Sequence, residues 1–458
     1  MKKWRYTLML AAVFFLASCQ SAQQTNTVSE IIVIEGATVI DGVSDTPIED
    51  AIIVIVGDTI QSIGKRGSLE PPPGARTINA AGKTILPGMF HLHGHVAMSE
   101  GFDRRMENYT RERVQRDANS YLYYGITHSI SLGLDQEPML GFLADQRAGR
   151  AGGARLYSAG LGFAAKDGWQ PAGVEEINRP TTPEEARALV RKELEKHPDV
   201  LKIWVDDRLG ELPKITPELY GAIIDEAHKN NVKVLAHMFY LEDAKELMRR
   251  GLDALAHSVR DKEVDEEFLA LAKEHGVTQV ATLVGHYGNL TYPQDTSFLD
   301  DPGVPLMVPA DALETLRSKE YQNQQAQSPT RERSRRQYET ALKNTAAIAA
   351  AGIPIAIGTD SSGASRVQGL WEHREMEHLV KAGLTPMQAI QAATANGAKL
   401  LGVDDKYGTL EPGKVADFVV LNANPLSDIT NSLQIDAVWM DGKPVNRAAL
   451  GHYSSGAN

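Results

Sequence analysis

Cysteine is almost absent from this sequence of 458 residues: the only one is Cys19. A single thiol has no partner within the chain, so intramolecular disulfides are excluded. Beyond the N-terminal leader there is no second run of about twenty apolar residues, the length that a membrane-spanning helix requires. Positive charge is not in excess, because 47 lysines and arginines face 59 aspartates and glutamates. The formal net charge of −12 argues against a nucleic acid as partner.

The N-terminus has the three-part pattern of an export signal. Basic residues come first, then an apolar run over about residues 6–17, then small residues. The string Leu16-Ala17-Ser18-Cys19 resembles the lipobox of bacterial lipoproteins. This resemblance implies a signal peptide over residues 1–18 and a lipid on Cys19, with residues 19–29 as a tether. Because Gln20 rather than Asp follows, it also implies, for a cell with two membranes, export to the periplasmic side of the outer membrane. The alternative is a chance cysteine in a plain signal peptide.

After Pro87 the sequence alternates between short apolar segments and amphipathic ones. Stretches such as 182–196 and 217–229 have helical spacing. Between such stretches lie eight segments with the length and composition of buried strands: 89–95, 124–132, 154–160, 200–206, 232–238, 254–259, 278–285 and 354–360. Eight strand–helix units predict an α/β fold, with a (β/α)8 barrel over residues 87–404.

Both ends of the chain have sequences that are typical of β-strands. Residues 30–86 contain apolar runs separated by turn signals, and residues 405–448 return to the same pattern. We expect the two segments to pair into one small β-sandwich domain beside the barrel. The connection 287–337 is long and polar for a barrel loop. The sequence is compatible with two interpretations, a lid over the barrel mouth and a surface loop.

Three of the thirteen histidines crowd together just after a Pro-Gly pair: His91, His93 and His95. Alternate residues of a strand point to the same face, so the three side chains project together. Imidazole nitrogens need polar partners, which a packed core does not supply and a metal does. The sequence therefore predicts a metal site that begins at the first barrel strand.

Other predicted strands also end in residues that bind metals. His237 and His257 end the fifth and sixth strands, and Asp360 ends the eighth. Active sites of such barrels lie at the C-terminal ends of the strands, where these side chains would meet. The histidines at matched strand ends thus predict one shared site rather than separate core residues.

Lys202, in the fourth strand, is the most informative residue of this set. Alternation with Leu201 and Ile203 turns it toward the barrel interior, where an ammonium group is costly to bury without a partner. A neutral lysine can instead react with carbon dioxide to form a carbamate, whose two oxygens can bridge two cations. The alternative is a lysine that is ion-paired with Asp206 or Asp360.

Together these motifs resemble the amidohydrolase superfamily, nearest to its imidazolonepropionase-like and dipeptidase-like branch. The resemblance extends from Ile31 to Pro444. It rests on His93, His95, Lys202, His237, His257, the string Gly358-Thr359-Asp360 and the string at 408–417 that returns to the β-rich domain. As a set the motifs are specific for the superfamily and only weakly specific for a substrate.

The resemblance implies two divalent metals, zinc before manganese, cobalt or iron. It assigns His93, His95 and Asp360 to one metal, His237 and His257 to the other, and a carboxylated Lys202 to the bridge. A metal-activated hydroxide would attack an amide carbonyl, and Asp360 would carry its proton to the leaving amine. Lys202 and Asp360 are therefore the expected catalytic residues.

His91 departs from the family pattern, which usually has aspartate at this position. It could weaken one metal site, act as an extra ligand, or support the ligands from behind, and we expect the last. Around the ligands, Arg260 and Arg208 can each bind a substrate carboxylate, or form salt bridges on the rim. His286, expected to end the seventh strand, can contact substrate or line the mouth.

Three functions are compatible with these observations. The first is hydrolysis of a C–N amide bond in a small peptide or N-acyl amino acid. The second is a mononuclear hydrolase or deaminase that acts on a cyclic amide or amidine. The third is a non-catalytic binding lipoprotein with the same fold. The expected partners are a small amide or dipeptide and, through the lipid on Cys19, a membrane; a homo-oligomer is left open.

Overall fold

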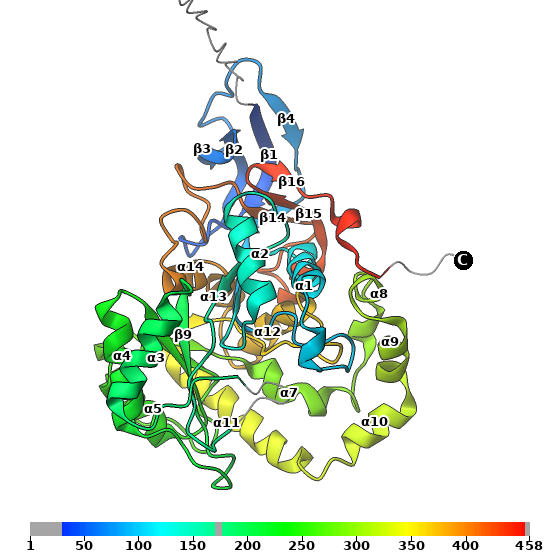
Figure 1. Cartoon of the computed structure of the whole chain (residues 1–458). Helices are drawn as coiled ribbons and strands as arrows, with labels where there is room; N and C mark the ends of the chain where they lie inside the picture. Colours follow the sequence, from blue (N-terminus) through cyan, green and yellow to red (C-terminus); the bar gives the residue numbers. More distant parts are fainter. Residues whose placement is uncertain (1–29, 170–175, 454–458) are drawn as a thin grey trace, which may run out of the picture.

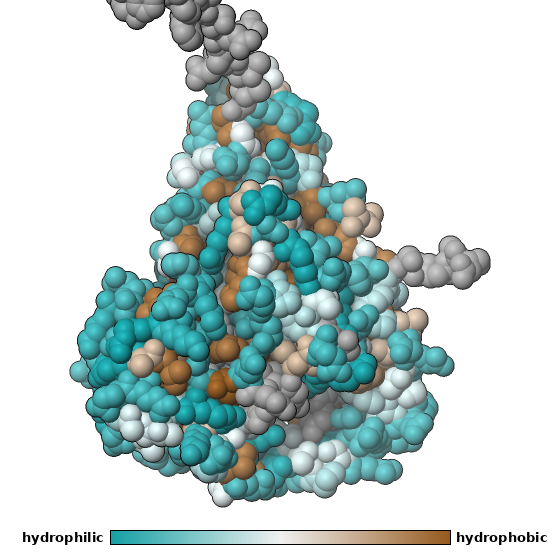
Figure 2. Space-filling view, viewed as in Figure 1, coloured by the Kyte–Doolittle hydropathy of each residue, from teal (hydrophilic) through white to brown (hydrophobic). Residues whose placement is uncertain are grey.

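The computed structural model describes residues 30–169 and 176–453, so the predicted signal peptide, the tether and Cys19 lie outside the described residues. Figure 1 shows a β-rich region, blue and red, above a larger α/β region. Figure 2 shows that hydrophilic side chains predominate on this face of both regions. Within the described ranges, none of the helices is long and apolar enough to span a membrane.

Strands from both ends of the chain form a single eight-stranded sheet. They are β1 Ile31–Val39, β2 Ile48–Val56, β3 Thr59–Lys65, β4 Arg76–Asn79, β5 Thr84–Pro87, β14 Phe418–Leu421, β15 Ile435–Met440 and β16 Lys443–Pro444. The order is β16-β15-β14-β5-β1-β2-β3, and β4 pairs with β1. Since β14 pairs antiparallel with β5, the C-terminal strands extend the N-terminal sheet.

Eight parallel strands follow, each within one of the segments predicted from the sequence. They are β6 Met89–Gly94, β7 Ile126–Ser131, β8 Arg155–Ser158, β9 Val200–Val205, β10 Lys233–Met238, β11 Ala254–Ala256, β12 Thr278–Val280 and β13 Ile355–Ala356. They form two hydrogen-bonded sheets, β6-β7-β8 and β13-β12-β11-β10-β9. Every residue of β6, β7, β9, β11, β12 and β13 is buried, as expected of strands that are covered on both faces.

Backbone hydrogen bonds join these two sheets at both seams. Leu92 N donates to Ile357 O over 2.9 Å, and Asp199 N donates to Ser158 O over 2.8 Å. The first bond sets β6 beside the segment that follows β13, and the second sets β8 beside the start of β9. The strands therefore close into a (β/α)8 barrel, and the predicted fold class is confirmed.

Helices alternate with the barrel strands and cover them. They are α1 Arg111–Tyr123, α2 Glu137–Arg147, α3 Pro183–Leu194, α4 Pro217–Lys229, α5 Leu241–Arg249, α6 Glu266–Glu274, α7 Leu283–Thr291, α8 Val304–Met307, α9 Ala310–Arg317, α10 Lys319–Ala326, α11 Arg331–Ala350, α12 Leu370–Lys381, α13 Pro386–Ala393 and α14 Ala395–Leu401. Short 3-10 helices lie at Met106–Asn108, Ser297–Asp300, Ile429–Leu433 and Arg447–Leu450. Local signals begin several helices; the Thr182 side chain, for example, accepts a hydrogen bond from Glu185 N at the start of α3.

The seventh strand is shorter than the sequence predicted. It ends at Val280, and α7 begins at Leu283, so His286 lies in a helix and not at the end of a strand. The chain turns at Thr282, whose φ of 57° is left-handed. Glu375 then accepts hydrogen bonds from Leu283 N and Val284 N, each over 2.8 Å, and so caps the new helix. This position of His286 corrects the sequence prediction; its side chain lies outside the described part of the structure.

The connection 287–337 is helical and packed. Tyr292, Phe298 and Leu299 share a buried cluster with Leu370 and Trp371 of α12. In Figure 1, α9 and α10 run along the right edge and α11 crosses below the barrel. The first turns of α11 contribute to the lining of a cavity that also includes residues following β9, β10 and β11. The segment is therefore anchored by its own apolar core, and its last part borders the barrel mouth.

Candidate metal centre and active site

Three of the predicted ligands converge at the C-terminal end of the barrel. Ligand atoms of His93, His257 and Asp360 all lie within 4.8 Å of one another. His93 lies on β6, His257 follows β11, and Asp360 follows β13. The His93 and His257 ring centroids are 4.4 Å apart. Two imidazoles and a carboxylate in this arrangement form a set that suits a divalent transition metal.

Two of these residues have strained backbone conformations. The φ angles of His257 and Asp360 are 85° and 54°, in the left-handed region that residues with a Cβ rarely adopt. Each such conformation costs about 1–3 kcal/mol and persists where the surrounding structure enforces it. The fold thus keeps both side chains in their positions at a local cost in free energy.

The two other predicted histidine ligands lie beside this group. His95 Nε2 is 3.0 Å from Asp360 Oδ1. His237 Nε2 is 2.7 Å from Asp206 Oδ2, and its ring centroid is 4.6 Å from that of His257. Burial lowers the pKa of His237, an effect that the contact with Asp206 opposes. The structure therefore brings all four histidines together, with His237 held by an aspartate.

Lys202 is buried in the barrel with an exposed fraction of 0%. Its Nζ atom has no hydrogen-bond partner among the described residues, so the ion pair with Asp206 or Asp360 is not formed. Burial lowers the pKa of Lys202 to about 7, against the opposing influence of Asp360. Gly133 makes room for the side chain, because a Cβ there would lie 2.8 Å from Lys202 Cβ. An amine in this position is unsatisfied unless it gains a ligand or is modified.

Asp360 is held by two cation-forming side chains. Arg366 Nη1 donates to Asp360 Oδ2 over 2.8 Å and to its carbonyl oxygen over 2.7 Å. Burial alone would raise the pKa of Asp360, but His95 and Arg366 outweigh it and hold that pKa well below the usual range. Asp360 is thus a carboxylate at neutral pH, in a state that can bind a cation or accept a proton.

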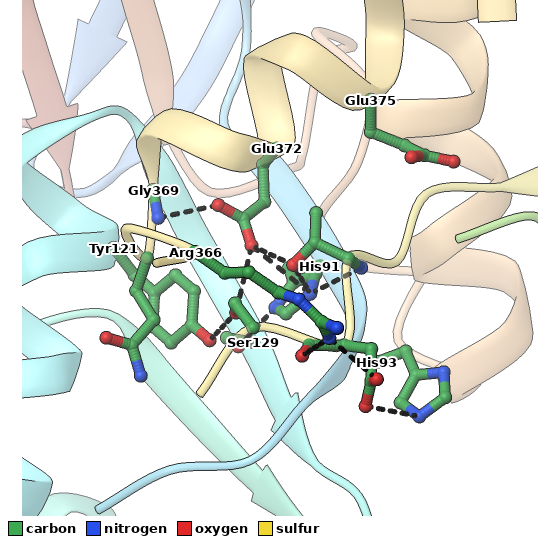
Figure 3. A network of polar contacts seen from close by, with 12 residues as sticks. His91, His93, Tyr121, Ser129, Arg366, Gly369, Glu372 and Glu375 are labelled. Carbon is green, nitrogen blue, oxygen red and sulfur yellow. Dashed lines mark hydrogen bonds and ion pairs between the residues drawn. The ribbon is translucent and has the colours of Figure 1, made fainter. Parts of the chain in front are cut away.

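His91 lies behind the ligands in a fully buried polar network (Figure 3). Its Nε2 accepts a hydrogen bond from Thr359 N over 3.1 Å, and its Nδ1 is 3.1 Å from Ser129 Oγ. Glu372 Oε1 lies 3.2 Å from His91 Nε2 and accepts a bond from Thr359 Oγ1 over 2.8 Å. His91 therefore fixes the backbone that leads into Asp360.

Two cavities open beside the cluster. One, of about 160 Å³, is lined by His95, Asp360, Arg366, Arg104, Ser362 and the apolar side chains of Met98, Leu134 and Trp169. The other, of about 310 Å³, contains the predicted substrate-binding residues Arg260 and Arg208. Arg260 is buried, whereas Arg208 is exposed. The smaller cavity borders the ligands His95 and Asp360 directly, whereas the larger one adjoins them through Asp206, which contacts His237.

Several residues of this site were not singled out from the sequence as site residues. Asp206 was considered only as an ion-pair partner, yet it binds His237. Arg366 and Glu372 follow the last strand and belong to no motif that we could read. The only signal is the pair Glu372 and Glu375, since both fall on the apolar side of α12, where a buried carboxylate requires a partner.

Comparison with known proteins agrees with this fold. The pattern of the Amidohydrolase family matches residues 84–445, and the chain belongs to that family. The predicted membership of the amidohydrolase superfamily is thereby confirmed.

Individual relatives are distant. Ochratoxinase of Aspergillus niger is 27% identical over 285 residues, 60% of this chain. This chain spans only 52% of the length of that relative. Imidazolonepropionase of Flavobacterium johnsoniae is 23% identical over 390 residues, which cover 81% of this chain and 85% of the relative. The crystal structure of a proposed prolidase from Bifidobacterium longum superposes with a TM-score of 0.72 at 26% identity, covering 92% of this chain and 98% of the other.

Proposed function

We propose that the protein hydrolyses the C–N amide bond of a small peptide or N-acyl amino acid at a centre of two divalent metals, with zinc the favoured ion. The observation that carries the proposal is Lys202. It is buried beside the histidines without a hydrogen-bond partner, which suits a carboxylated lysine that bridges two cations. The likeness to a proposed prolidase supports a peptide-type amide as substrate.

The proposed ligands divide between the two ions as the family resemblance implies. His93, His95 and Asp360 would hold one, and His237 and His257 the other, with Lys202 between them. Bound there, divalent metals lower the pKa of water toward 7 and polarise the substrate carbonyl. To bind the second ion, His237 would either give up its contact with Asp206 or use one ring nitrogen for the metal and the other for Asp206.

Three side chains around the proposed metals would have different roles in the reaction. Asp360, held ionised by Arg366 and His95, would accept a proton at its carboxylate and pass it to the leaving amine. Trp169, whose ring centroid is 5.8 Å from that of His237, would cover the site from the solvent side and limit the entry of water. His91 keeps Thr359, and with it Asp360, in place.

A mononuclear site is the second candidate. Only His93, His257 and Asp360 form a compact ligand set among the described residues, and three ligands suffice for one catalytic metal. The likeness to imidazolonepropionase favours a cyclic amide or amidine as its substrate. The number of metals per chain distinguishes the two candidates.

Substitution of Lys202 tests the proposal. We expect Lys202→Ala to lower the metal content from two ions per chain and to reduce amide hydrolysis by orders of magnitude. Lys202→Arg should behave alike, because a guanidinium cannot form a carbamate. Short carboxylic acids should restore part of the Lys202→Ala activity by supplying two oxygens. The measurements are elemental analysis after loading with metal and bicarbonate, and turnover of dipeptides, N-acyl amino acids and lactams.

Lys192→Ala on α3 is the matched control, since this lysine is exposed. It should keep the wild-type metal content and rate. If Lys202→Ala keeps two metals and full activity, the bridging role is wrong. One metal in the loaded wild-type protein would favour the mononuclear candidate instead.

A further inference from the structure

The larger cavity beside the metal centre has an unusual charge distribution. Its volume is about 310 Å³, and its lining includes Arg208, Arg260 and Arg333, which outnumber the acidic groups Asp206 and Glu211. Both carboxylate oxygens of Asp206 have hydrogen-bond partners. Its Oδ2 atom accepts from His237, and its Oδ1 atom accepts from Arg208 N. Arg208, Arg333 and Glu211 are exposed residues, so Arg260 is the buried arginine of this lining. Three arginines against two carboxylates leave an excess of positive charge around the cavity.

Arg260 is the buried member of this set. Only 9% of its surface is exposed, and its guanidinium lies 4.8 Å from the Phe239 ring centroid. Its Nη1 donates to two backbone oxygens, those of Met238 over 2.9 Å and Ser258 over 3.2 Å. Asp206, Asp360 and Asp261 act on its charge from a distance, and no direct salt bridge to Arg260 is formed among the described residues. A guanidinium that is buried without a direct ion pair can gain from a bound anion.

The position of Arg260 relates this charge to the reacting bond. It follows the proposed ligand His257 by three residues. Asp206, another lining residue, contacts the proposed ligand His237. A group bound to Arg260 thus lies near the ligands of the metal centre. The cavity can hold one residue of a small substrate, with the Phe239 ring beside its apolar part.

We propose that Arg260 binds a carboxylate of the substrate, so that the enzyme selects amides that carry a free carboxylate close to the scissile bond. A guanidinium fork matches a planar carboxylate through two parallel hydrogen bonds, and the bound anion would neutralise the buried charge. This inference rests on the proposed amide hydrolysis and specifies its substrate class. Neutral lactams, which have no such group, would be poor substrates.

The test compares dipeptides and N-acyl amino acids with their C-terminal carboxamides. The wild-type enzyme should prefer the free acids in kcat/KM by about 100-fold, the discrimination expected for a buried charge-assisted pair. Arg260→Gln should abolish this preference, because the rate on the acids falls far more than the rate on the carboxamides. Arg260→Lys should retain part of the preference, because it keeps the charge and loses the fork. Arg336→Gln, at an exposed arginine of α11 outside the cavity, is the control.

A binding measurement makes the test independent of turnover. Calorimetry on the metal-free protein should show that N-acetylglycine binds and N-acetylglycinamide does not, and that Arg260→Gln removes the difference. If no amide is hydrolysed but this binding difference is present, the proposed function fails and the carboxylate site stands. Equal rates on acids and carboxamides, or an equal loss on both in Arg260→Gln, would overturn the inference even if amide hydrolysis is confirmed.

Discussion

The carboxyl group of Glu372 is buried beside His91 Nε2. The protonation states of these two residues depend on each other. His91 Nε2 accepts a hydrogen bond from Thr359 N and so carries no proton, and Glu372 Oε1 lies 3.2 Å from the same nitrogen. Burial lowers the pKa of His91 to about 3 and raises that of Glu372 to about 7, although hydrogen bonds from Thr359 and Gly369 oppose the latter shift. Both groups are therefore neutral in the folded protein between about pH 3 and pH 7.

This assignment predicts a pH dependence of stability. Because the pKa of Glu372 in the folded state lies above its usual value of 4.5, its stabilising contribution is complete below about pH 4.5 and is lost as the pH rises through about 7. Glu372→Gln mimics the neutral carboxyl. We expect the unfolding free energy of the wild type to fall more steeply between pH 5 and 8 than that of the variant, as measured by urea denaturation.

Glu372→Ala should be less stable than wild type by about 1–3 kcal/mol at every pH, since it leaves the Thr359 hydroxyl and Gly369 N without their acceptor. The exposed Glu274→Gln should keep the wild-type slope. A wild-type slope in Glu372→Gln as well would mean that Glu372 is ionised in the folded protein.

Some residues of the site can be predicted from the sequence, and others cannot. The histidines of the first, fifth and sixth strands could be proposed as ligands because strand alternation and strand ends fix where such side chains point. Glu372 could not, since a glutamate in an amphipathic helix normally faces solvent. Its burial depends on how α12 packs against the barrel, which no local pattern encodes.

At the scale of elements, the strand that leads to Asp360 depends on a glycine. A Cβ at Gly358 would lie 2.6 Å from His93 Cβ and 2.6 Å from Val280 Cγ1, well inside van der Waals contact. Neither atom is the end of a long flexible side chain, because one is the Cβ of a β6 residue and the other is a methyl group of a short side chain on β12. The absence of a side chain at this position lets the segment after β13 lie close to both strands.

Gly358→Ala should therefore push β6 and the Asp360 segment apart. We expect a loss of about 1–3 kcal/mol in the unfolding free energy, the usual cost of overpacking, together with weaker metal binding through displaced His93. Gly141→Ala on α2 is a matched control, because nothing lies within 4 Å of a Cβ there. It should be neutral or stabilise by about 0.5–1 kcal/mol. A Gly358→Ala protein with unchanged stability and metal affinity would contradict the argument.

Elements also show where the sequence is informative and where it is not. All eight barrel strands fall inside the predicted segments, because buried apolar runs are distinctive. Their ends are less distinctive: β13 covers only Ile355–Ala356 of the predicted 354–360, since the residues beyond serve the site. The end of β12 depends on the Thr282 turn and on Glu375, which is remote in sequence.

For the whole molecule, the position of the site relative to the chain ends bears on how the enzyme meets its substrate. The β-rich region lies at the N-terminal end of the described chain, and the barrel lies below it in Figure 1. The proposed ligands lie at the C-terminal ends of the barrel strands. The helix α11, which borders the larger cavity, crosses below the barrel in Figure 1, away from the β-rich region. A chain tethered at its N-terminus would thus be held by the β-rich region.

The lipid anchor is the prediction that belongs to this scale. Residues 1–29 lie outside the described structure, so the proposal of an exported lipoprotein rests on the sequence Leu16-Ala17-Ser18-Cys19. We expect the full-length protein to partition with detergent and to carry acyl groups on Cys19 by mass spectrometry. Cys19→Ser should lose the lipid and become extractable without detergent, while a purified form keeps its metal content and amide hydrolysis, because Cys19 precedes the first described residue. A native N-terminus at another position, without acyl groups, would exclude anchoring by this route.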